Sequence, residues 1–263
     1  MSLPSDDELR SAGLAVVHDD SILTITLDKP TRRNSQTPRM WHTLEAIGEG
    51  LPEEVRVVIL RGAGDCFSAG IDTALLTPEG VEGEESVHAL MQQDDQSVLD
   101  AIDGYQRGFT WLSDPRLVTV ASVHGYAIGA GFQLALACDL RVVADDVRFC
   151  MKEPALGLVP DLAGTKPLVD LVGYSRALEI CATARFVEAD EAQHLGLATV
   201  VVPRAELDAA TADLVGAVLA SSAGAVRETK ALLQQAGDLD LDSQRLAERR
   251  AQLRRFREIV RGA

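Results

Sequence analysis

The segment Leu117–Cys138 has the sequence LVTVASVHGYAIGAGFQLALAC and contains no Asp, Glu, Lys or Arg. Its length would suit a membrane span, but three glycines and two polar side chains interrupt the apolar run. A buried strand over Leu117–Val123, a turn, and a helix over about Gly129–Cys138 explain this pattern better than a membrane helix does. The segment therefore predicts a strand–turn–helix unit inside a folded core.

Further strands lie on both sides of this unit. Val55–Leu60 is rich in β-branched residues, as expected of a strand buried on both faces, and Leu140–Ala144 is a third strand. Helical patterns separate the three strands, which predicts a parallel α/β architecture with crossover connections. Nearer the N-terminus, Ala15–Val17 and Ile22–Leu27 predict an antiparallel hairpin, and apolar spacing within Arg39–Glu49 predicts a helix.

The C-terminal part of the chain is predominantly helical. Helical patterns dominate from Thr165 onward, apart from a short strand at Ala198–Val202. The last segment, Asp242–Arg261, carries seven arginines with apolar residues between them. It predicts a basic amphipathic helix that docks on another subunit or on a phosphate. We expect a core over residues 1–202 and a C-terminal helical subdomain over residues 203–263.

The charge balance argues against two classes of partner. The 263 residues include 25 Lys and Arg and 40 Asp and Glu, for a formal net charge of −15. A protein this acidic has no general affinity for nucleic acid or for an anionic membrane. Any anionic ligand must therefore be held by local cations.

Cysteine and histidine spacing suggests a reduced, metal-free protein. The four cysteines lie far apart and form no CxxC or Cys/His cluster, which disfavours a disulfide framework or a structural zinc site. The five histidines show no ligand spacing, and His124 fits a core or turn position better than a catalytic one. The polar, acidic stretch Met1–Arg10 is no signal peptide, so we expect a cytoplasmic protein.

One long segment is acidic. Residues 62–106 contain ten acidic residues and no Lys or Arg. Charge blocks of this kind usually form solvated, mobile insertions, and this interpretation is favoured. The alternative is a lid over a binding site.

Two further segments, Asp65–Asp72 and Val123–Phe132, each join a buried strand to a small-residue turn and a predicted helix start. The first predicts a helix beginning near Ile71, whose free N–H groups could stabilise an oxyanion. The second lacks GxGxxG and GxxxxGK[ST], which excludes the nucleotide-binding fingerprints. Each could also be only a tight turn or close helix–sheet packing. Together they indicate two converging N–H donors, as a thioester oxygen needs when its carbonyl becomes an enolate.

Two acidic residues lie among apolar neighbours downstream. Burial would raise the carboxyl pKa of Glu153 and of Asp161 toward the range of general acid–base catalysis. The alternatives are a surface pair between Glu153 and Lys152, and a helix cap at Asp161, which follows Pro160.

In this order and spacing, these segments resemble the crotonase superfamily, the enoyl-CoA hydratases and isomerases. The resemblance runs from about Leu14 to the C-terminus. It implies a spiral of ββα turns with a C-terminal helical trimerisation region, assembled as a trimer or a dimer of trimers. Its pieces are Pro30–Asn34, Phe67–Asp72, His124–Asp139, Glu153–Gly164, Leu195–Ala198 and Val200–Pro203.

The resemblance also implies an acyl-CoA thioester as substrate, with coenzyme A as part of the substrate and no separate cofactor. The backbone N–H groups of Ile71 and Ala130 would form the oxyanion hole. The implied contacts to coenzyme A and substrate are Arg32, Arg33, Ala69, Gly70, Asp72, Thr73, Ala74 and Lys230. For the three cations in this list, Arg32, Arg33 and Lys230, the alternative is that they are solvated surface charges.

One position departs from the hydratase pattern. Family hydratases use two glutamates around one water; Glu153 matches the second, whereas the first falls on Gln133, a neutral amide that cannot accept a proton. Some family isomerases place an aspartate at the position of Asp161. The resemblance therefore favours double-bond isomerisation of a fatty or small acyl-CoA, with Glu153 as acid and base. The alternatives are a hydratase in which Gln133 positions the water, a non-catalytic acyl-CoA-binding protein, and a helical scaffold that binds protein partners through its arginine-rich tail.

Overall fold

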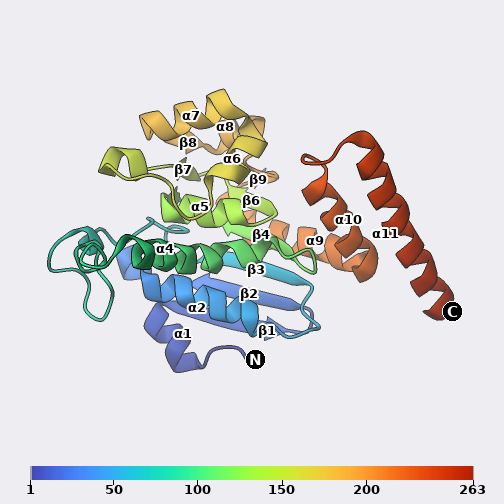
Figure 1. The fold of residues 1–263 in the computed structure, drawn as a ribbon, viewed down its shortest axis with the longest axis horizontal. Helices are drawn as coiled ribbons and strands as arrows, with labels where there is room; N and C mark the ends of the chain where they lie inside the picture. Colours follow the sequence, from blue (N-terminus) through green and yellow to red (C-terminus); the bar gives the residue numbers. More distant parts are fainter. Residues whose placement is uncertain (1, 263) are drawn as a thin grey trace.

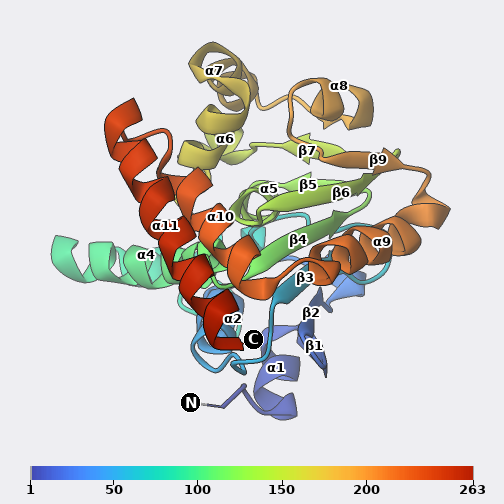
Figure 2. The same ribbon diagram turned by 90° about the vertical axis from the view of Figure 1, so that its right-hand side faces the viewer.

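The computed structural model describes residues 2–262, which form two β-sheets surrounded by helices (Figures 1 and 2). The larger sheet has the strand order β1-β2-β3-β4-β6-β9, and the smaller has the order β5-β7-β8. The strands are β1 (Leu14–Asp19), β2 (Ile22–Leu27), β3 (Val57–Gly62), β4 (Val118–Val123), β5 (Tyr126–Ile128), β6 (Leu140–Ala144), β7 (Arg148–Cys150), β8 (Val187–Glu188) and β9 (Val200–Val202).

The chain alternates between the two sheets as it advances. After β4 in the larger sheet, it enters the smaller sheet as β5 and continues into helix α5 (Ala130–Ala137); β6 and β7 repeat the step. Strands β1 and β2 pair antiparallel, and every pair from β2 to β9 in the larger sheet is parallel. The predicted α/β class, hairpin, parallel sheet and spiral of ββα turns are confirmed.

Helices cover both faces of the larger sheet. The α-helices besides α5 are α1 (Asp6–Ala12), α2 (Pro38–Glu49), α3 (Val87–Leu90), α4 (Asp95–Thr110), α6 (Thr165–Val172), α7 (Tyr174–Thr183), α8 (Ala189–His194), α9 (Leu207–Ala220), α10 (Ala223–Gln235) and α11 (Leu241–Gly262). Short 3₁₀ helices are η1 (Pro30–Arg32), η2 (Thr73–Leu76), η3 (Trp111–Ser113), η4 (Glu153–Leu156) and η5 (Arg204–Glu206).

Apolar side chains form a core on each face of the larger sheet. On one face, Ala121 and Val123 of β4 belong to the same buried cluster as Phe132 and Leu134 of α5. On the other face, Val120 packs in a second cluster with residues of α9. All six residues of β4 are buried, as predicted for a strand covered on both sides. The site described below lies on the α5 face.

The acidic segment is more ordered than its charge predicts. Much of it forms α4, which packs against α2 and buries Tyr105 and Phe109. The rings of Trp41 and Tyr105 lie 5.1 Å apart at this contact. The expectation of a solvated, mobile insertion was therefore wrong for α4, because apolar residues at helical spacing outweigh the surrounding charge.

Element boundaries differ slightly from the predicted ones. The strand expected at Val55–Leu60 is β3 (Val57–Gly62), because its parallel pairing with β2 extends to Gly62. The C-terminal strand is confined to β9, and α2 begins one residue earlier than predicted, at Pro38.

The C-terminal helices are of two kinds. Helix α9 packs on the larger sheet, whereas α10 and α11 form a hairpin that projects from the body of the molecule (Figure 1). The boundary between residues 202 and 203 stays a prediction. Within residues 2–262, no single helix is long and apolar enough to cross a membrane; the segments Arg204–Ala220 and Ala223–Gln235 meet the criterion only as a pair bent by 103°.

Candidate active site

The segment Ser68–Asp72 follows β3 and exposes one backbone donor. Gln36 pairs alongside it: its N–H donates to the Gly70 carbonyl at 2.8 Å, and its carbonyl accepts from Asp72 N–H at 2.8 Å. Because N–H groups alternate in direction along an extended chain, Ile71 N–H faces away from Gln36. Within residues 2–262 it has no hydrogen-bond acceptor.

The turn before α5 meets this segment. Gly70 has φ of +86°, and a Cβ there would lie 2.4 Å from the Ile128 carbonyl oxygen and 3.4 Å from Ala130 N. Gly70 is therefore required for the close approach. Ala130 is the first residue of α5, and its N–H likewise has no acceptor among the described residues. The structure thus brings together the two predicted donors, Ile71 and Ala130.

The helix predicted to begin near Ile71 was wrong in detail. Ile71 forms an isolated bridge with Gln36, and only the 3₁₀ turn η2 follows, capped by Asp72. The Ile71 N–H belongs to an extended segment that pairs with Gln36 on its other side, and not to the first turn of a helix.

A buried carboxylate lies beside the second donor. The Gln133 side chain on α5 donates from Nε2 to Glu153 Oε1 at 2.7 Å. A Cβ on Gly129 would lie 3.2 Å from the same carboxylate oxygen. The other oxygen, Glu153 Oε2, is buried and has no hydrogen-bond partner within residues 2–262. The proposed surface pair with Lys152 is therefore wrong: Glu153 belongs to the interior, and one of its oxygens is available for chemistry.

The amide of Gln133 has a defined orientation. Its Oε1 accepts from the backbone N–H of Leu162 at 2.9 Å and of Gly164 at 3.2 Å. Because the carbonyl oxygen is occupied, only the NH₂ group faces Glu153. Gln133 therefore acts as a hydrogen-bond donor toward the carboxylate.

The pKa values of Glu153 and Asp161 are both raised, which favours the protonated carboxyl groups. Burial raises the pKa of Glu153, and the nearby charge of Asp161 adds to the shift, while the hydrogen bond from Gln133 opposes it. Asp161 is exposed at the surface, yet desolvation by surrounding protein atoms raises its pKa as well. The helix-cap alternative for Asp161 is wrong, because α6 begins at Thr165 and its N-cap residue is Gly164.

The predicted coenzyme A loop lies against the first donor segment. Arg32 Nη2 donates to Asp72 Oδ2 at 2.8 Å, and the Arg33 carbonyl accepts from Ala69 N–H at 2.8 Å. The same Asp72 accepts from Ala74 N–H and so caps η2, which begins at Thr73. The arginine loop and the segment from Ala69 to Ala74 are thus one continuous surface.

Lys230 lies apart from this surface. It is buried, and its Nζ donates to the carbonyls of Asp114 and Leu117 and to Asp139 Oδ2, at 2.9, 3.0 and 2.8 Å. These contacts anchor α10 to the core, and a contact between Lys230 and a phosphate stays a prediction. Lys230 also lines a cavity of about 1090 Å³ between α5, α6 and α10.

A set of polar residues near the site had no predicted role. The stretch Asn34–Thr37 consists of polar residues, yet all four are buried. Asn34 Nδ2 donates to the carbonyls of Ala63, Cys66 and Phe67, and Gln36 and Ser68 bond to each other. Nothing in the sequence signals this burial, because polar runs are usually exposed.

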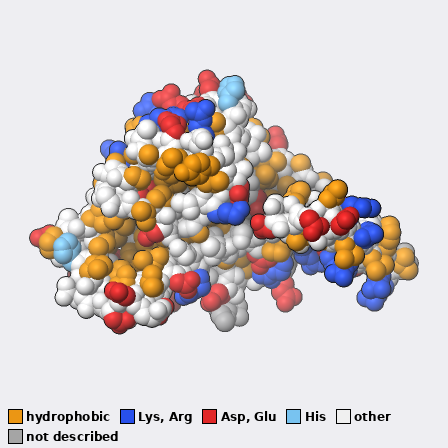
Figure 3. Space-filling view, turned by 45° about the horizontal axis from the view of Figure 1, so that its top comes forward, with side chains coloured by type: hydrophobic (Ala, Val, Ile, Leu, Met, Phe, Trp, Pro, Cys, Tyr) orange, Lys and Arg blue, Asp and Glu red, His pale blue; other side chains and the backbone are white. Residues whose placement is uncertain are grey.

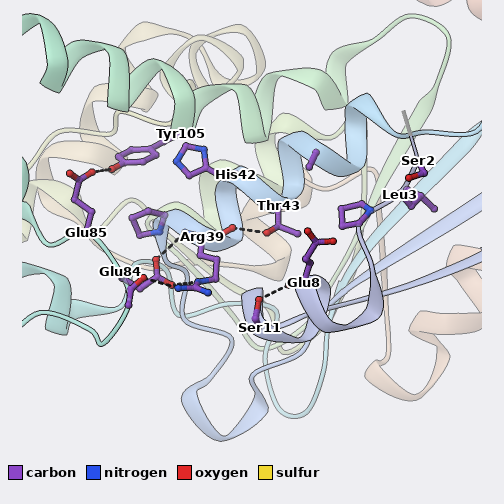
Figure 4. Close-up of a pocket in the computed structure, with 14 residues that line it drawn as sticks. Ser2, Leu3, Glu8, Ser11, Arg39, His42, Thr43, Glu84, Glu85 and Tyr105 are labelled. Atoms are coloured by element: carbon purple, nitrogen blue, oxygen red, sulfur yellow. Dashed lines mark hydrogen bonds and ion pairs between the residues drawn. The ribbon is translucent and has the colours of Figure 1, made fainter.

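A second cavity, of about 740 Å³, lies outside this site. Its lining includes Arg39, His42, Glu84, Glu85 and Tyr105, from α2, the acidic segment and α4 (Figure 4). Within residues 2–262, no group of three or more His, Cys, Asp and Glu side chains is arranged to hold a metal ion.

A buried carboxylate beside two free backbone N–H groups, on a spiral of ββα turns, defines a site for proton transfer next to a carbonyl group. The chain belongs to the enoyl-CoA hydratase/isomerase family, in the crotonase superfamily: the family model matches residues 18–259.

Some similar proteins are named as isomerases and others as hydratases. The peroxisomal Δ(3,5)-Δ(2,4)-dienoyl-CoA isomerase of Arabidopsis thaliana is 29% identical over 85% of this chain and 81% of that one. A Thermobifida fusca YX protein designated an enoyl-CoA hydratase, solved with CoA, is 49% identical, with a TM-score of 0.94 over 99% of each chain. Its structure with acetoacetyl-CoA is 50% identical, with a TM-score of 0.95 over 98% of this chain and 100% of that one. The protein is therefore an enzyme of the enoyl-CoA hydratase/isomerase kind.

Proposed function

We propose that the protein binds an acyl-CoA thioester and moves a double bond along its acyl chain. The thioester carbonyl oxygen accepts hydrogen bonds from the N–H groups of Ile71 and Ala130. Their freedom from protein acceptors supports this role, as does the bound acetoacetyl-CoA in the similar Thermobifida fusca structure. Coenzyme A enters as part of the substrate, and no separate cofactor is proposed.

The nucleotide and pantetheine portions lie along the continuous surface beside the first donor. Arg32 and Arg33 supply local positive charge on an acidic protein, and the backbone from Ala69 to Ala74 flanks the thioester. The ion pair between Arg32 and Asp72 supports this assignment because it holds the guanidinium beside η2.

The proposed reaction is a proton transfer in two steps. Glu153 Oε2 removes a proton from a carbon conjugated with the thioester, and the electron pair of the broken C–H bond moves through the conjugated system onto the carbonyl oxygen. Protonated Glu153 then donates this proton to a different carbon, which forms a new C–H bond, restores the carbonyl and leaves the double bond shifted. No oxidant, reductant or water is consumed, so a single base and an oxyanion hole suffice.

We choose isomerisation over hydration because of the orientation of the Gln133 amide. Its carbonyl oxygen is occupied by two backbone N–H groups, so it presents only N–H donors to Glu153. A donor in this position holds Glu153 Oε1 and leaves Oε2 for the substrate proton. It cannot take a proton from a water molecule.

Asp161 offers a second proton carrier. Its raised pKa and its charge interaction with Glu153 are consistent with two carboxyl groups serving two carbons of one acyl chain. This arrangement suits a conjugated dienoyl-CoA, the substrate class named for the Arabidopsis thaliana relative.

Hydration is the second candidate. It is favoured by the Thermobifida fusca proteins, which are designated enoyl-CoA hydratases. In this case the second N–H of Gln133 would donate to a water whose proton passes to Glu153 Oε2.

Mass spectrometry in heavy water separates the two reactions. A trans-2-enoyl-CoA and a 3,5-dienoyl-CoA are each incubated with the protein in D₂O. Deuterium incorporation and a shifted double bond without a gain of water are expected, whereas addition of one water would make the protein a hydratase. Binding of both thioesters with no exchange would indicate a non-catalytic acyl-CoA-binding protein.

Variants test the role of each carboxyl group. Glu153→Gln should lower turnover by about 10²–10⁴-fold, the usual contribution of a positioned acid–base group, while thioester affinity is retained. Asp161→Asn should slow exchange at one carbon more than at the other. Glu54→Gln, at an exposed position, is the control. Unchanged turnover in Glu153→Gln would remove Glu153 from the mechanism.

A further inference from the structure

A buried hydrogen-bond network lies beside the loop that carries the Ile71 N–H. Gln36 and Ser68 have no exposed surface. The Trp41 indole Nε1 donates to Gln36 Oε1 at 2.8 Å, and Gln36 Nε2 donates to Ser68 Oγ at 3.1 Å. Ser68 Oγ in turn donates to the Asn34 carbonyl at 2.7 Å and accepts from Gly70 N–H at 3.2 Å.

The side-chain hydrogen bonds of this network run in one direction, from Trp41 through Gln36 and Ser68 to the Asn34 carbonyl. The indole can only donate, so it sets the Gln36 amide with its oxygen toward Trp41 and its NH₂ group toward Ser68. The Ser68 hydroxyl hydrogen is used on the Asn34 carbonyl, which leaves its oxygen to accept from Gln36 and Gly70. Aligned hydrogen bonds of this kind strengthen one another in a low-dielectric interior.

One hydrogen bond from Gln36 acts directly on the peptide that joins Gly70 and Ile71. Gly70 C=O and Ile71 N–H belong to the same planar peptide and point in opposite directions. The Gly70 carbonyl accepts from the backbone N–H of Gln36 at 2.8 Å. This bond both orients the peptide plane and polarises it, which makes Ile71 N–H a stronger donor.

We propose that Gln36 and Ser68 are positioning residues that set the direction and strength of the Ile71 oxyanion donor. The inference rests on the proposed function, because it assigns a role to Ile71 N–H in thioester binding. The Gln36 side chain is fastened at one end to α2 through Trp41 and at the other to Ser68, so its backbone N–H cannot turn away from Gly70. The Ser68 hydroxyl oxygen accepts from the N–H of Gly70, the residue before Ile71. This bond restrains the same loop from its buried side.

Simple core filling does not account for this arrangement. A buried amide and hydroxyl cost free energy unless every polar atom is bonded, and an apolar side chain would fill the space without that requirement. The Gln36 amide oxygen and nitrogen each have a partner, and the Gln36 backbone N–H bonds to the carbonyl of the donor peptide.

The test measures polarisation of a bound carbonyl. Butanoyl-CoA labelled with ¹³C at the thioester carbon has no double bond to move, and its ¹³C chemical shift reports the strength of the oxyanion hole. The wild-type protein should move this resonance downfield on binding. Gln36→Met and Ser68→Ala should each reduce that displacement and lower kcat about tenfold, less than the 10²–10³-fold loss seen when an oxyanion donor is removed outright, with KM changed by less than about threefold.

Two further variants keep the inference falsifiable. Trp41→Phe removes the indole N–H donor and part of the ring system, keeps an aromatic side chain at that position, and should give an intermediate displacement even if Gln36→Met does not fold. Thr211→Val removes a buried hydroxyl on α9, on the opposite face of the larger sheet, and should lower stability without moving the resonance.

The outcomes separate the two proposals. A full wild-type displacement in folded Trp41→Phe and Ser68→Ala would overturn the inference and leave the proposed function standing. If the wild-type protein neither binds butanoyl-CoA nor displaces its carbonyl resonance, the proposed function fails and the inference falls with it.

Discussion

Glu153 is the residue at which function and stability conflict. Its Oε2 is buried and has no partner among the residues that the structure describes, and burial raises the carboxyl pKa. Since the ionised form is disfavoured in the folded protein, the free energy of unfolding should fall as this group ionises. An unsatisfied buried oxygen is also what a base needs in order to reach a substrate proton.

A pH series tests this conflict. The folded pKa of Glu153 lies above its ordinary value of 4.5, so its stabilising contribution is complete below about pH 4.5 and is lost as the pH rises through the folded pKa. Glu153→Gln stays neutral throughout and should melt at a higher temperature than the wild type at pH 7, by roughly 2–4 °C for each kcal/mol regained. The difference should vanish at pH 4, and Glu54→Gln should show no such trend. A lower melting temperature for Glu153→Gln at pH 7 would contradict the account.

Among the elements, the part of the acidic segment that precedes α4 is joined to the N-terminus of α2 through Glu84. Thr37, the N-cap residue of α2, makes no side-chain capping bond. Glu84 takes over that role: its Oε2 accepts from Arg39 N–H at 3.0 Å, while Arg39 Nη2 donates to the Gly83 carbonyl at 2.7 Å (Figure 4). A carboxylate at a helix N-terminus is favourable both as a cap and as a charge.

Removing this cap should loosen both elements together. Glu84→Ala should speed amide hydrogen exchange in residues 79–93 and in the first turn of α2, by about five- to thirtyfold for a cap worth about 1–2 kcal/mol. Glu82→Ala, at an exposed position in the same segment, is the matched control. Equal exchange in the two variants would show that the segment is held by other contacts.

A buried lysine fastens α10 to the core. Lys230→Met would leave the Asp139 carboxylate without its ammonium partner, and breaking such a pair typically costs about 3–5 kcal/mol. Chemical denaturation should show this loss, whereas Lys166→Met, which breaks an exposed pair with Asp170, should change stability by less than about 1 kcal/mol. If Lys230→Met weakens CoA binding and leaves stability intact, the lysine acts on a phosphate instead.

At the scale of the whole molecule, the projecting hairpin has an unpartnered surface. Apolar and basic side chains lie together along its far end (Figure 3). Phe256, Ile259 and Val260 of α11 are 56%, 61% and 77% exposed. Isolated apolar residues at a surface are ordinary, but a row of them on one helix marks an interaction site. Self-association as a trimer or a dimer of trimers stays a prediction that this surface would serve, and a cytoplasmic location likewise stays a prediction.

Truncation before Asp242 tests that role. Loss of α11 should lower the assembly to smaller species, and affinity for CoA thioesters should fall with it. Analytical ultracentrifugation and calorimetric titration of the same samples measure both. An unchanged oligomeric state would assign the exposed apolar row to some other partner.

The architecture could be predicted from the sequence. Apolar runs, glycine turns and helical spacing are local patterns, and they predicted the parallel sheet, the N-terminal hairpin and α5. These predictions succeeded because burial of a regular strand or helix leaves a periodic trace in the chain. The choice of Glu153 as acid and base rested on the family resemblance and stays a prediction.

Only the tertiary structure decided which polar groups are buried together. Gln133 and Glu153 are 20 residues apart, and Lys230 and Leu117 are 113 apart, so no local pattern relates them. The burial of Gln36 and the order in α4 escaped prediction for the same reason: polar composition suggests exposure until a distant segment supplies the partners. The orientation of the Gln133 amide, and with it the proposed reaction, depends on backbone N–H groups that every residue except proline carries and that therefore leave no signature in the sequence.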